Sequence, residues 1–269
     1  MGHSEIKKSR VIKKQIQSLE KKERKVLNRK QFKFVKDKMQ PIQEKLEDKI
    51  PKGLQLTLEN AFATSFKLVF EKGIDVIEKS YNKEEKNIQF DIQHYAVLKK
   101  VTHKNIKNID KTAQKSMIIN QVITTVEGSA LGFLGIGLPD IPILIGMILK
   151  NIYEISLSYG FDYTKERERI YILYLICASV TKEQAQANYS KLLDEVISNK
   201  SSIEAASYNL EVIIKETAHR LAEAMLVAKF IQGLPIVGIV GGLSNYTIMK
   251  DINNMAKIKY KKRYLEKLI

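Results

Sequence analysis

Apolar side chains recur at helical spacing along most of this chain, and this pattern constrains its fold more than any other feature. Between Leu54 and Lys79 they stand four residues apart, at Leu54, Leu58, Phe62, Phe66, Phe70 and Ile74. Similar patterns predict helices over Ser9–Lys38, Ile88–Ile109, Lys111–Thr125, Ile141–Tyr159, Arg167–Val180 and Ser202–Phe230. No segment alternates convincingly as a half-buried strand does. The sequence therefore predicts an all-α protein with a single multi-helix domain of about eight to ten helices.

Turn and capping residues place the breaks between these helices. The polar stretch Asn82–Asn87 is expected to form a loop. Gly160 is expected to end the preceding helix in the left-handed conformation. Thr181, with Gln184 three residues later, is typical of a capping box and predicts the start of another helix.

Two glycine-rich apolar segments, Gly128–Leu149 and Gly233–Met249, differ from the rest of the chain. They match at an offset of 96 residues, so that Gly137-Leu-Pro corresponds to Gly233-Leu-Pro. We interpret them as a pseudo-repeat in which a Gly-Leu-Pro turn opens a glycine-containing helix. The two repeat helices are expected to lie next to each other near the centre of the domain.

Neither segment resembles a membrane span, which needs roughly 20 predominantly apolar residues. Asp140 divides the first into charge-free pieces of 12 and 9 residues, and polar residues and glycines interrupt the second. Two interpretations stay open. The segments form either close-packed core helices, in which glycines such as Gly238 allow backbones to approach, or a hairpin that contacts lipid.

Positive charge is abundant and unevenly distributed. The net charge is +15, and residues 1–50 alone hold 16 Lys or Arg against 7 Asp or Glu. Such an excess predicts an anionic partner, although a lysine-rich composition alone also raises the charge. The basic N-terminal helix has three interpretations: a helix on a membrane surface, a solvated arm, or a contact for nucleic acid or protein. Nucleic acid is disfavoured, because the chain has no recognisable reading module.

The cations expected to contact lipid headgroups lie near both ends of the chain. They are Lys13, Lys14, Lys21, Lys22, Arg24, Lys25, Arg29, Lys30, Lys261, Lys262 and Arg263. We interpret residues 1–43 as a basic amphipathic extension and residues 44–269 as the all-helical domain. The N-terminus has no charged-then-apolar leader, so we expect a cytoplasmic location.

Residues that suggest catalysis are sparse. The chain has no zinc-binding His-Glu-x-x-His, no phosphate-binding loop and no nucleophile elbow. An enzyme would have to use Asp140, Glu154 and His219. If buried, the carboxylates of Asp140 and Glu154 would have perturbed pKa values. The alternative is that these are structural polar groups with satisfied hydrogen bonds. We expect no metal and no cofactor, and Cys177 is expected to pack as a small hydrophobe.

Two stretches resemble the EcsC protein family. GLPDIPILIGMILKNIYEISLSYGFD (Gly137–Asp162) is similar to its signature, in which a Pro-Asp-like pair precedes a helix ending in a Tyr-Gly-Phe-Asp-like motif. PIVGIVGGLSNYTIMKDINNMAKIKYKKRYL (Pro235–Leu265) resembles the family's second glycine-rich element, with its Asn-Tyr pair and closing Arg-Tyr-Leu. The resemblance covers roughly Glu44–Leu268.

The resemblance implies signature positions without an assigned catalytic role: Asp140, Glu154, Tyr159, Gly160, Asn245 and Tyr246. The family takes its name from a member encoded beside an ABC transporter. Some members carry a peptidase-like label, for which this sequence shows no supporting residues. Adding the glycine-rich turns gives the candidates for contact with a ligand or membrane: Gly137, Pro139, Asp140, Glu154, Tyr159, Gly160, Gly233, Pro235, Gly238, Asn245 and Tyr246.

Charge and apolar patterning together predict a non-enzymatic protein that is peripheral to the inner face of the cell membrane. It would bind anionic lipid or a lipid-like ligand, with a membrane transporter as a further expected partner. Two alternatives stay open: a hydrolase-like enzyme with the buried carboxylate–histidine site, and a helical adaptor for other proteins.

Overall fold

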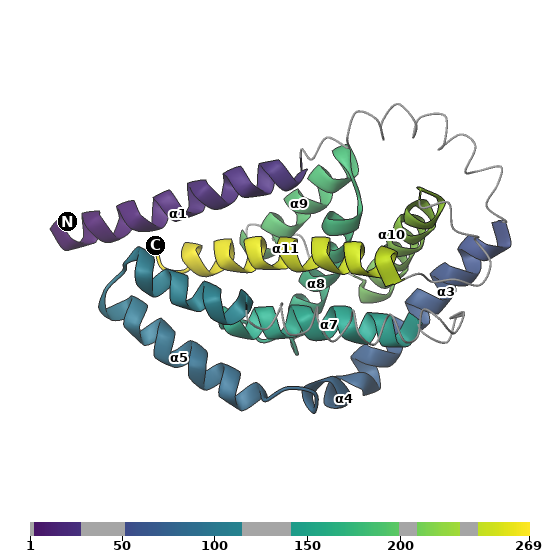
Figure 1. The fold of residues 1–269 in the computed structure, drawn as a ribbon, viewed down its shortest axis with the longest axis horizontal. Coiled ribbons are helices and arrows are strands. Elements are labelled where there is room, and N and C mark those ends of the chain that lie inside the picture. Colours follow the sequence, from purple (N-terminus) through teal and green to yellow (C-terminus); the bar gives the residue numbers. More distant parts are fainter. Residues whose placement is uncertain (1–2, 28–51, 115–140, 199–208, 232–241) are drawn as a thin grey trace.

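A computed structural model of the chain describes residues 3–27, 52–114, 141–198, 209–231 and 242–269. Within these ranges every regular element is a helix, which confirms the all-α class (Figure 1). The elements are α1 (His3–Leu27), α3 (Lys52–Leu68), a π-helical turn (Val69–Gly73), α4 (Ile74–Glu78), α5 (Lys83–Lys99), α7 (Ile141–Ser158), α8 (Glu166–Val180), α9 (Glu183–Ser198), α10 (Leu210–Ile231) and α11 (Gly242–Glu266). Residues 103–114 are also helical.

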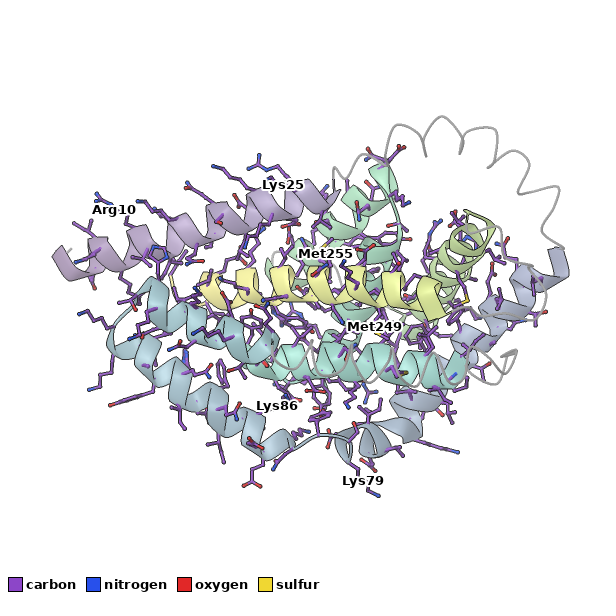
Figure 2. All side chains as sticks on the ribbon, viewed as in Figure 1. Arg10, Lys25, Lys79, Lys86, Met249 and Met255 are labelled. Carbon is purple, nitrogen blue, oxygen red and sulfur yellow. The ribbon has the colours of Figure 1, made fainter. Side chains whose placement is uncertain are left out.

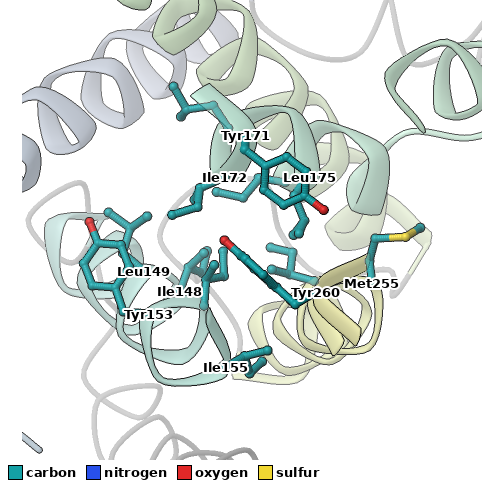
Figure 3. Close-up of a cluster of buried hydrophobic side chains, with 14 of the residues drawn as sticks. Ile148, Leu149, Tyr153, Ile155, Tyr171, Ile172, Leu175, Met255 and Tyr260 are labelled. Carbon is teal, nitrogen blue, oxygen red and sulfur yellow. The ribbon is translucent and has the colours of Figure 1, made fainter. Parts of the chain in front are cut away.

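Helix α7 forms the centre of the domain. Of its 18 residues 13 are buried, and it packs against α3, α5 and α11. Figure 3 shows Ile148 and Leu149 of α7 gathered with Ile172 of α8 and Met255 of α11 in one apolar cluster. A helix that is apolar around most of its circumference belongs in a core.

The core interpretation of the first glycine-rich segment therefore holds for its described residues, which begin at Ile141. Within the described ranges α7 is also the one helix long and apolar enough to cross a membrane, and 72% of it is buried inside the protein. The preceding residues of this segment, and most of the second segment, lie outside the described residues.

Helices α7 and α11, which contain the described parts of the two pseudo-repeats, lie side by side and run in the same direction. In the middle of α7, Asn151 Nδ2 is 3.0 Å from Met249 Sδ. Beyond the end of α7, the rings of Tyr159 and Tyr264 are 6.3 Å apart. The predicted adjacency of the two repeat helices is thus confirmed for the residues that the structure describes.

Helix α1 packs along α11 through its C-terminal half, while its first turns extend beyond the end of α11 (Figure 1). Its inner face buries Ile12 and Leu19. Gln15 Nε2 lies 2.8 Å from His103 Nδ1 and so also ties α1 to the 103–114 helix. The predicted boundary between residues 43 and 44 lies outside the described residues, so the division into extension and domain stays a prediction.

Several predicted helix ends are wrong. Asn82–Asn87 is not a loop, because Asn82 Oδ1 accepts a hydrogen bond from the Glu85 amide (2.9 Å) and caps α5. Thr181 does not cap α9. Its hydroxyl donates to the Cys177 carbonyl oxygen (2.7 Å) at the end of α8, and α9 begins two residues later. The predicted end of α7 is confirmed: Gly160 follows it with φ of 74°.

Candidate functional site

The two segments that resemble the family patterns meet in the structure. The turn Tyr159–Asp162, which follows α7, contacts the last turns of α11. The rings of Phe161 and Tyr260 lie 5.5 Å apart, and the Arg263 guanidinium carbon is 4.1 Å from the centre of the Phe161 ring. We call this contact the signature junction, and define it by Tyr159–Asp162 and Tyr260–Tyr264.

Asp110, from the 103–114 helix, binds both sides of the signature junction. The Tyr159 hydroxyl donates to Asp110 Oδ1 (3.0 Å), and Lys261 Nζ lies 2.6 Å from Asp110 Oδ2. Burial raises the pKa of Tyr159 well above its usual value, and the neighbouring Asp110 charge raises it further. Tyr159 is therefore a neutral hydrogen-bond donor, and Lys261 supplies the charge that balances Asp110.

Glu168 of α8 makes an equivalent pair of contacts with α11. Its Oε1 accepts from the Tyr260 hydroxyl (2.8 Å) and from Arg263 Nη1 (2.7 Å). Burial, and then the Glu168 charge, raise the pKa of Tyr260 well above its usual value. Asp110 and Glu168, which contact the junction from two other helices, are thus each engaged by one tyrosine and one cation, an arrangement that satisfies buried charges and joins helices.

Gly160 allows the turn of the junction to pass close to α5. A Cβ at this position would lie 2.3 Å from Phe90 Cζ, and the positive φ also disfavours any residue with a side chain. Phe90 stacks on His94, whose Nδ1 lies 3.0 Å from the Tyr264 hydroxyl. The glycine therefore brings α5 against the end of α11.

A second group of tyrosines, which the sequence analysis missed, joins the α4–α5 turn to the turn after α7. The Tyr163 hydroxyl donates to Glu78 Oε1 (2.5 Å) and lies 2.7 Å from the Tyr81 hydroxyl. Lys83 Nζ completes the group, 2.7 Å from the same Glu78 oxygen. The Tyr153 ring stacks on Tyr163 at 4.0 Å. Because Tyr81 and Tyr163 are 82 positions apart, no local pattern could have paired them.

The residues proposed for an enzyme have different partners. Glu154 is buried in α7 and forms an ion pair with Lys86 of α5, with 2.7 Å between Oε2 and Nζ. His219 of α10 lies 2.8 Å from Glu59 of α3, measured from Nδ1 to Oε1. Asp140 lies outside the described residues. The ion pair explains how the Glu154 carboxylate is accommodated in the core.

Several other candidate residues fall wholly or partly outside the described part of the chain. Gly137, Pro139, Gly233, Pro235, Gly238, Arg29 and Lys30 lie outside the described residues. Asn245 and Tyr246 belong to the first turns of α11, but their side chains are not among those described. Their roles stay predictions.

The three C-terminal cations proposed to meet lipid are engaged inside the protein. Lys261 and Arg263 form the junction pairs, and Lys262 Nζ lies 3.7 Å from Asp194 Oδ2. Their side chains are only 10–16% exposed. The sequence predicts a basic tail here, but most of this segment is the second half of α11. Four of its six cations, Lys259, Lys261, Lys262 and Arg263, are paired with carboxylates of other helices.

Lys259 fastens α1 to this half of α11. Its side chain is 1% exposed, and Nζ lies 2.6 Å from Glu23 Oε1 of α1 and 3.2 Å from Asp194 Oδ1 of α9. Ser190 of α9 donates to Glu23 (2.8 Å) and accepts from Lys259 (2.8 Å). Burial alone would raise the pKa of Glu23, but the Lys259 charge and these hydrogen bonds hold it below its usual value. We call these four residues the Lys259 clamp.

The outer face of α1 is basic. Helix α1 has two acidic residues that are not buried, Glu5 and Glu20, against a larger number of exposed cations. Figure 2 shows Arg10 and Lys25 on the side of α1 that faces away from α11. The exposed cations of α1 are Lys7, Lys8, Arg10, Lys13, Lys14, Lys21, Lys22, Arg24 and Lys25. At 100° per residue seven of these cations lie opposite the docked side and form the outer face of α1, whereas Lys8 and Lys22 lie nearer the docked side.

Metal binding has no visible site in the described ranges of the chain, where no three His, Cys, Asp or Glu side chains come together in a suitable group. The described contacts instead define a class: an all-α protein whose last helix is joined by tyrosine–carboxylate contacts and ion pairs to the turn after its central helix. The chain belongs to the EcsC protein family, because the family's model matches residues 13–265. This match begins inside α1, the helix that the sequence analysis assigned to a separate extension.

Two curated relatives from Bacillus subtilis (strain 168) are similar over a portion of their length. Protein EcsC is 25% identical over 160 residues, which is 58% of this chain and 64% of the relative. Uncharacterized protein YdbA is 29% identical over 151 residues, which is 54% of each chain. The matches thus span less than two thirds of either relative. No solved structure matches this chain.

Proposed function

We propose that this protein is a peripheral membrane protein that binds anionic lipid through the outer face of α1. The observation that supports this most directly is the separation of charge on that helix. Nine cations of this helix are exposed, and helical spacing places seven of them opposite the side that buries Ile12 and Leu19 and that the Lys259 clamp holds to α11. A docked helix presents its cations to one plane at the same time, as a flat anionic surface requires.

The magnitude of the attraction is adequate for reversible binding. Each Lys or Arg near an anionic membrane surface contributes about 1 kcal/mol. Because the C-terminal cations are paired with carboxylates, the proposal depends on α1 alone and not on both ends of the chain. High salt should weaken such binding, since exposed charges are screened within about 10 Å at 0.1 M.

Co-sedimentation with vesicles tests the proposal. Neutral phosphatidylcholine vesicles are compared with vesicles that also contain phosphatidylserine, at low and high salt. Replacing Lys13, Lys14, Lys21 and Lys25 by Gln should weaken binding to the anionic vesicles by about a thousandfold, from about 1 kcal/mol per charge. A matched control removes the same number of exposed lysines elsewhere: Lys72, Lys79, Lys191 and Lys215. Equal losses in the two variants, or equal binding to both kinds of vesicle, would refute the role of α1.

A further inference from the structure

Helix α5 is apolar on two opposite faces, although the described structure covers only one of them. Its inner face, with Phe90 and Val97, packs toward α7, and Val97 is fully buried. Its outer face carries four exposed apolar side chains: Ile88 (51% exposed), Ile92 (65%), Tyr95 (61%) and Leu98 (59%). The spacing of Ile88, Ile92 and Tyr95 places them along one line of the helix, one turn after another. A contiguous exposed apolar stripe of this kind marks an interaction surface.

The charges at the two ends of this stripe differ in sign. Glu84 and Glu85 are exposed at the N-terminal end of α5, and Lys99 and Lys100 are exposed at its C-terminal end. A helix that carries acid at one end and base at the other complements itself when a second copy lies antiparallel to it. Two-fold symmetric contacts, in which the same surface is used twice, are the commonest form of self-association.

We infer that the outer face of α5 is a homodimer interface, in which two copies of α5 pack antiparallel about a two-fold axis at Ile92. In that arrangement residue numbers that sum to 184 stand opposite each other. Ile92 meets Ile92 of the second copy, and Glu85 meets Lys99 of the second copy at both ends of the stripe. At 100° per residue, Glu85, Ile92 and Lys99 lie on the same flank of the helix, so the opposite charges approach each other across the dyad.

The charge pattern favours a second copy over a membrane as the occupant of this face. Asp91, Glu84 and Glu85 border the apolar stripe and would be repelled by anionic lipid. Asp91 stands one residue from the dyad on the other flank, where it approaches Asp91 of the second copy. The interface therefore contains one repulsive Asp91–Asp91 pair between two attractive Glu85–Lys99 pairs. Substitutions of these residues should affect a dimer in a way that lipid binding would not reproduce.

Sedimentation equilibrium of the full chain tests the inference, because a 30.8 kDa chain that dimerises doubles its mass with concentration. A one-helix interface is smaller than the standard of about 800 Å² per partner, so we expect a micromolar or weaker dimer. Ile92→Glu should raise the dissociation constant at least tenfold. The control is Leu56→Glu on α3, at a comparable exposure of 59%, which should change nothing. Both sites are exposed, so circular dichroism should show unchanged folding.

Charge exchange decides whether the packing is antiparallel. Glu85→Lys and Lys99→Glu should each weaken the dimer several-fold, and the double variant should restore it, because the exchange swaps both ends of the same pair. Lys99→Glu lowers the net charge, so a general charge effect would strengthen association where the inference predicts weakening. Asp91→Asn should tighten the dimer. A monomer at all concentrations, an unaffected Ile92→Glu variant, or a double variant weaker than either single one would each overturn the inference.

Discussion

Replacing Lys259 by Met is the perturbation for which the structure gives the clearest magnitude. Lys259 Nζ is buried between Glu23 of α1 and Asp194 of α9. Methionine keeps an unbranched side chain that is one atom shorter, and it leaves the Glu23 carboxylate buried, with Ser190 as its remaining partner in the clamp. Removing one partner of a buried pair typically costs 3–5 kcal/mol. We expect a value near the lower end, about 3 kcal/mol, because Asp194 is 47% exposed and remains hydrated.

Urea unfolding followed by circular dichroism measures this loss, and thermal unfolding should show a decrease in Tm of about 6–12 °C, at about 2–4 °C per kcal/mol for a chain of this size. The double variant Glu23→Leu with Lys259→Met removes both charges. It should recover most of the stability, because replacing a buried pair by apolar residues is often nearly neutral. The difference from additivity, on the order of 2 kcal/mol, isolates the coupling between the two residues.

The pH dependence supplies an independent check with a definite sign. In the wild-type protein the folded-state pKa of Glu23 is lowered, so its stabilising contribution is complete above the unfolded pKa of about 4.3 and is lost as the pH falls through the lower folded value. In Lys259→Met the same carboxyl is buried without its cation, which raises its pKa. The penalty of the substitution should therefore shrink between pH 7 and pH 5. A constant penalty, or a double variant no more stable than Lys259→Met, would refute the reasoning.

Two further substitutions test the local geometry. Gly160→Ala should lower the free energy of unfolding by about 2–4 kcal/mol, since it adds the cost of a positive φ to a clash with Phe90. Gly146→Ala in α7, where a Cβ meets no atom within 4 Å, should instead stabilise the protein by up to about 1 kcal/mol. Thermal unfolding of both variants checks the contrast. Cys177 is fully buried, and burial raises the pKa of its thiol to about 12. A thiol reagent at pH 8 should therefore label it only as fast as the protein unfolds. Rapid labelling of the folded protein would show that this region of α8 opens locally.

The helical fold could be predicted from the sequence because the spacing of apolar residues within a segment indicates that the segment is a helix. The stripe from Leu58 to Phe70 is buried as expected, and α7 begins at Ile141 and ends before Gly160 as predicted. The N-terminus of α5 was missed because its polar first turn resembles a loop until Asn82 is recognised as its cap. Helix existence is a local property, while helix ends depend on single hydrogen bonds.

The role of the C-terminal cations could not be predicted from the sequence. The run from Lys257 to Lys267 holds six cations and one acid, which is typical of a solvated basic tail. Its burial depends on carboxylates that are distant in the sequence. Lys259 forms an ion pair with Glu23, 236 positions earlier, and Lys261 forms one with Asp110, 151 positions earlier. No local pattern records such pairs, and only the packing of α1, α8 and the 103–114 helix around α11 brings them together.

The different fates of the two basic ends follow from what each helix packs against. The second half of α11 is surrounded by helices that supply Glu23, Asp110 and Glu168, so its cations hold the bundle together. Helix α1 contacts the domain along one face, and nine of its cations stay exposed. Basic residues therefore form ion pairs between helices inside the protein in α11, whereas in α1 they are mostly surface charges. Since the Lys259 clamp connects them, the buried cation of α11 determines in which direction the exposed cations of α1 point.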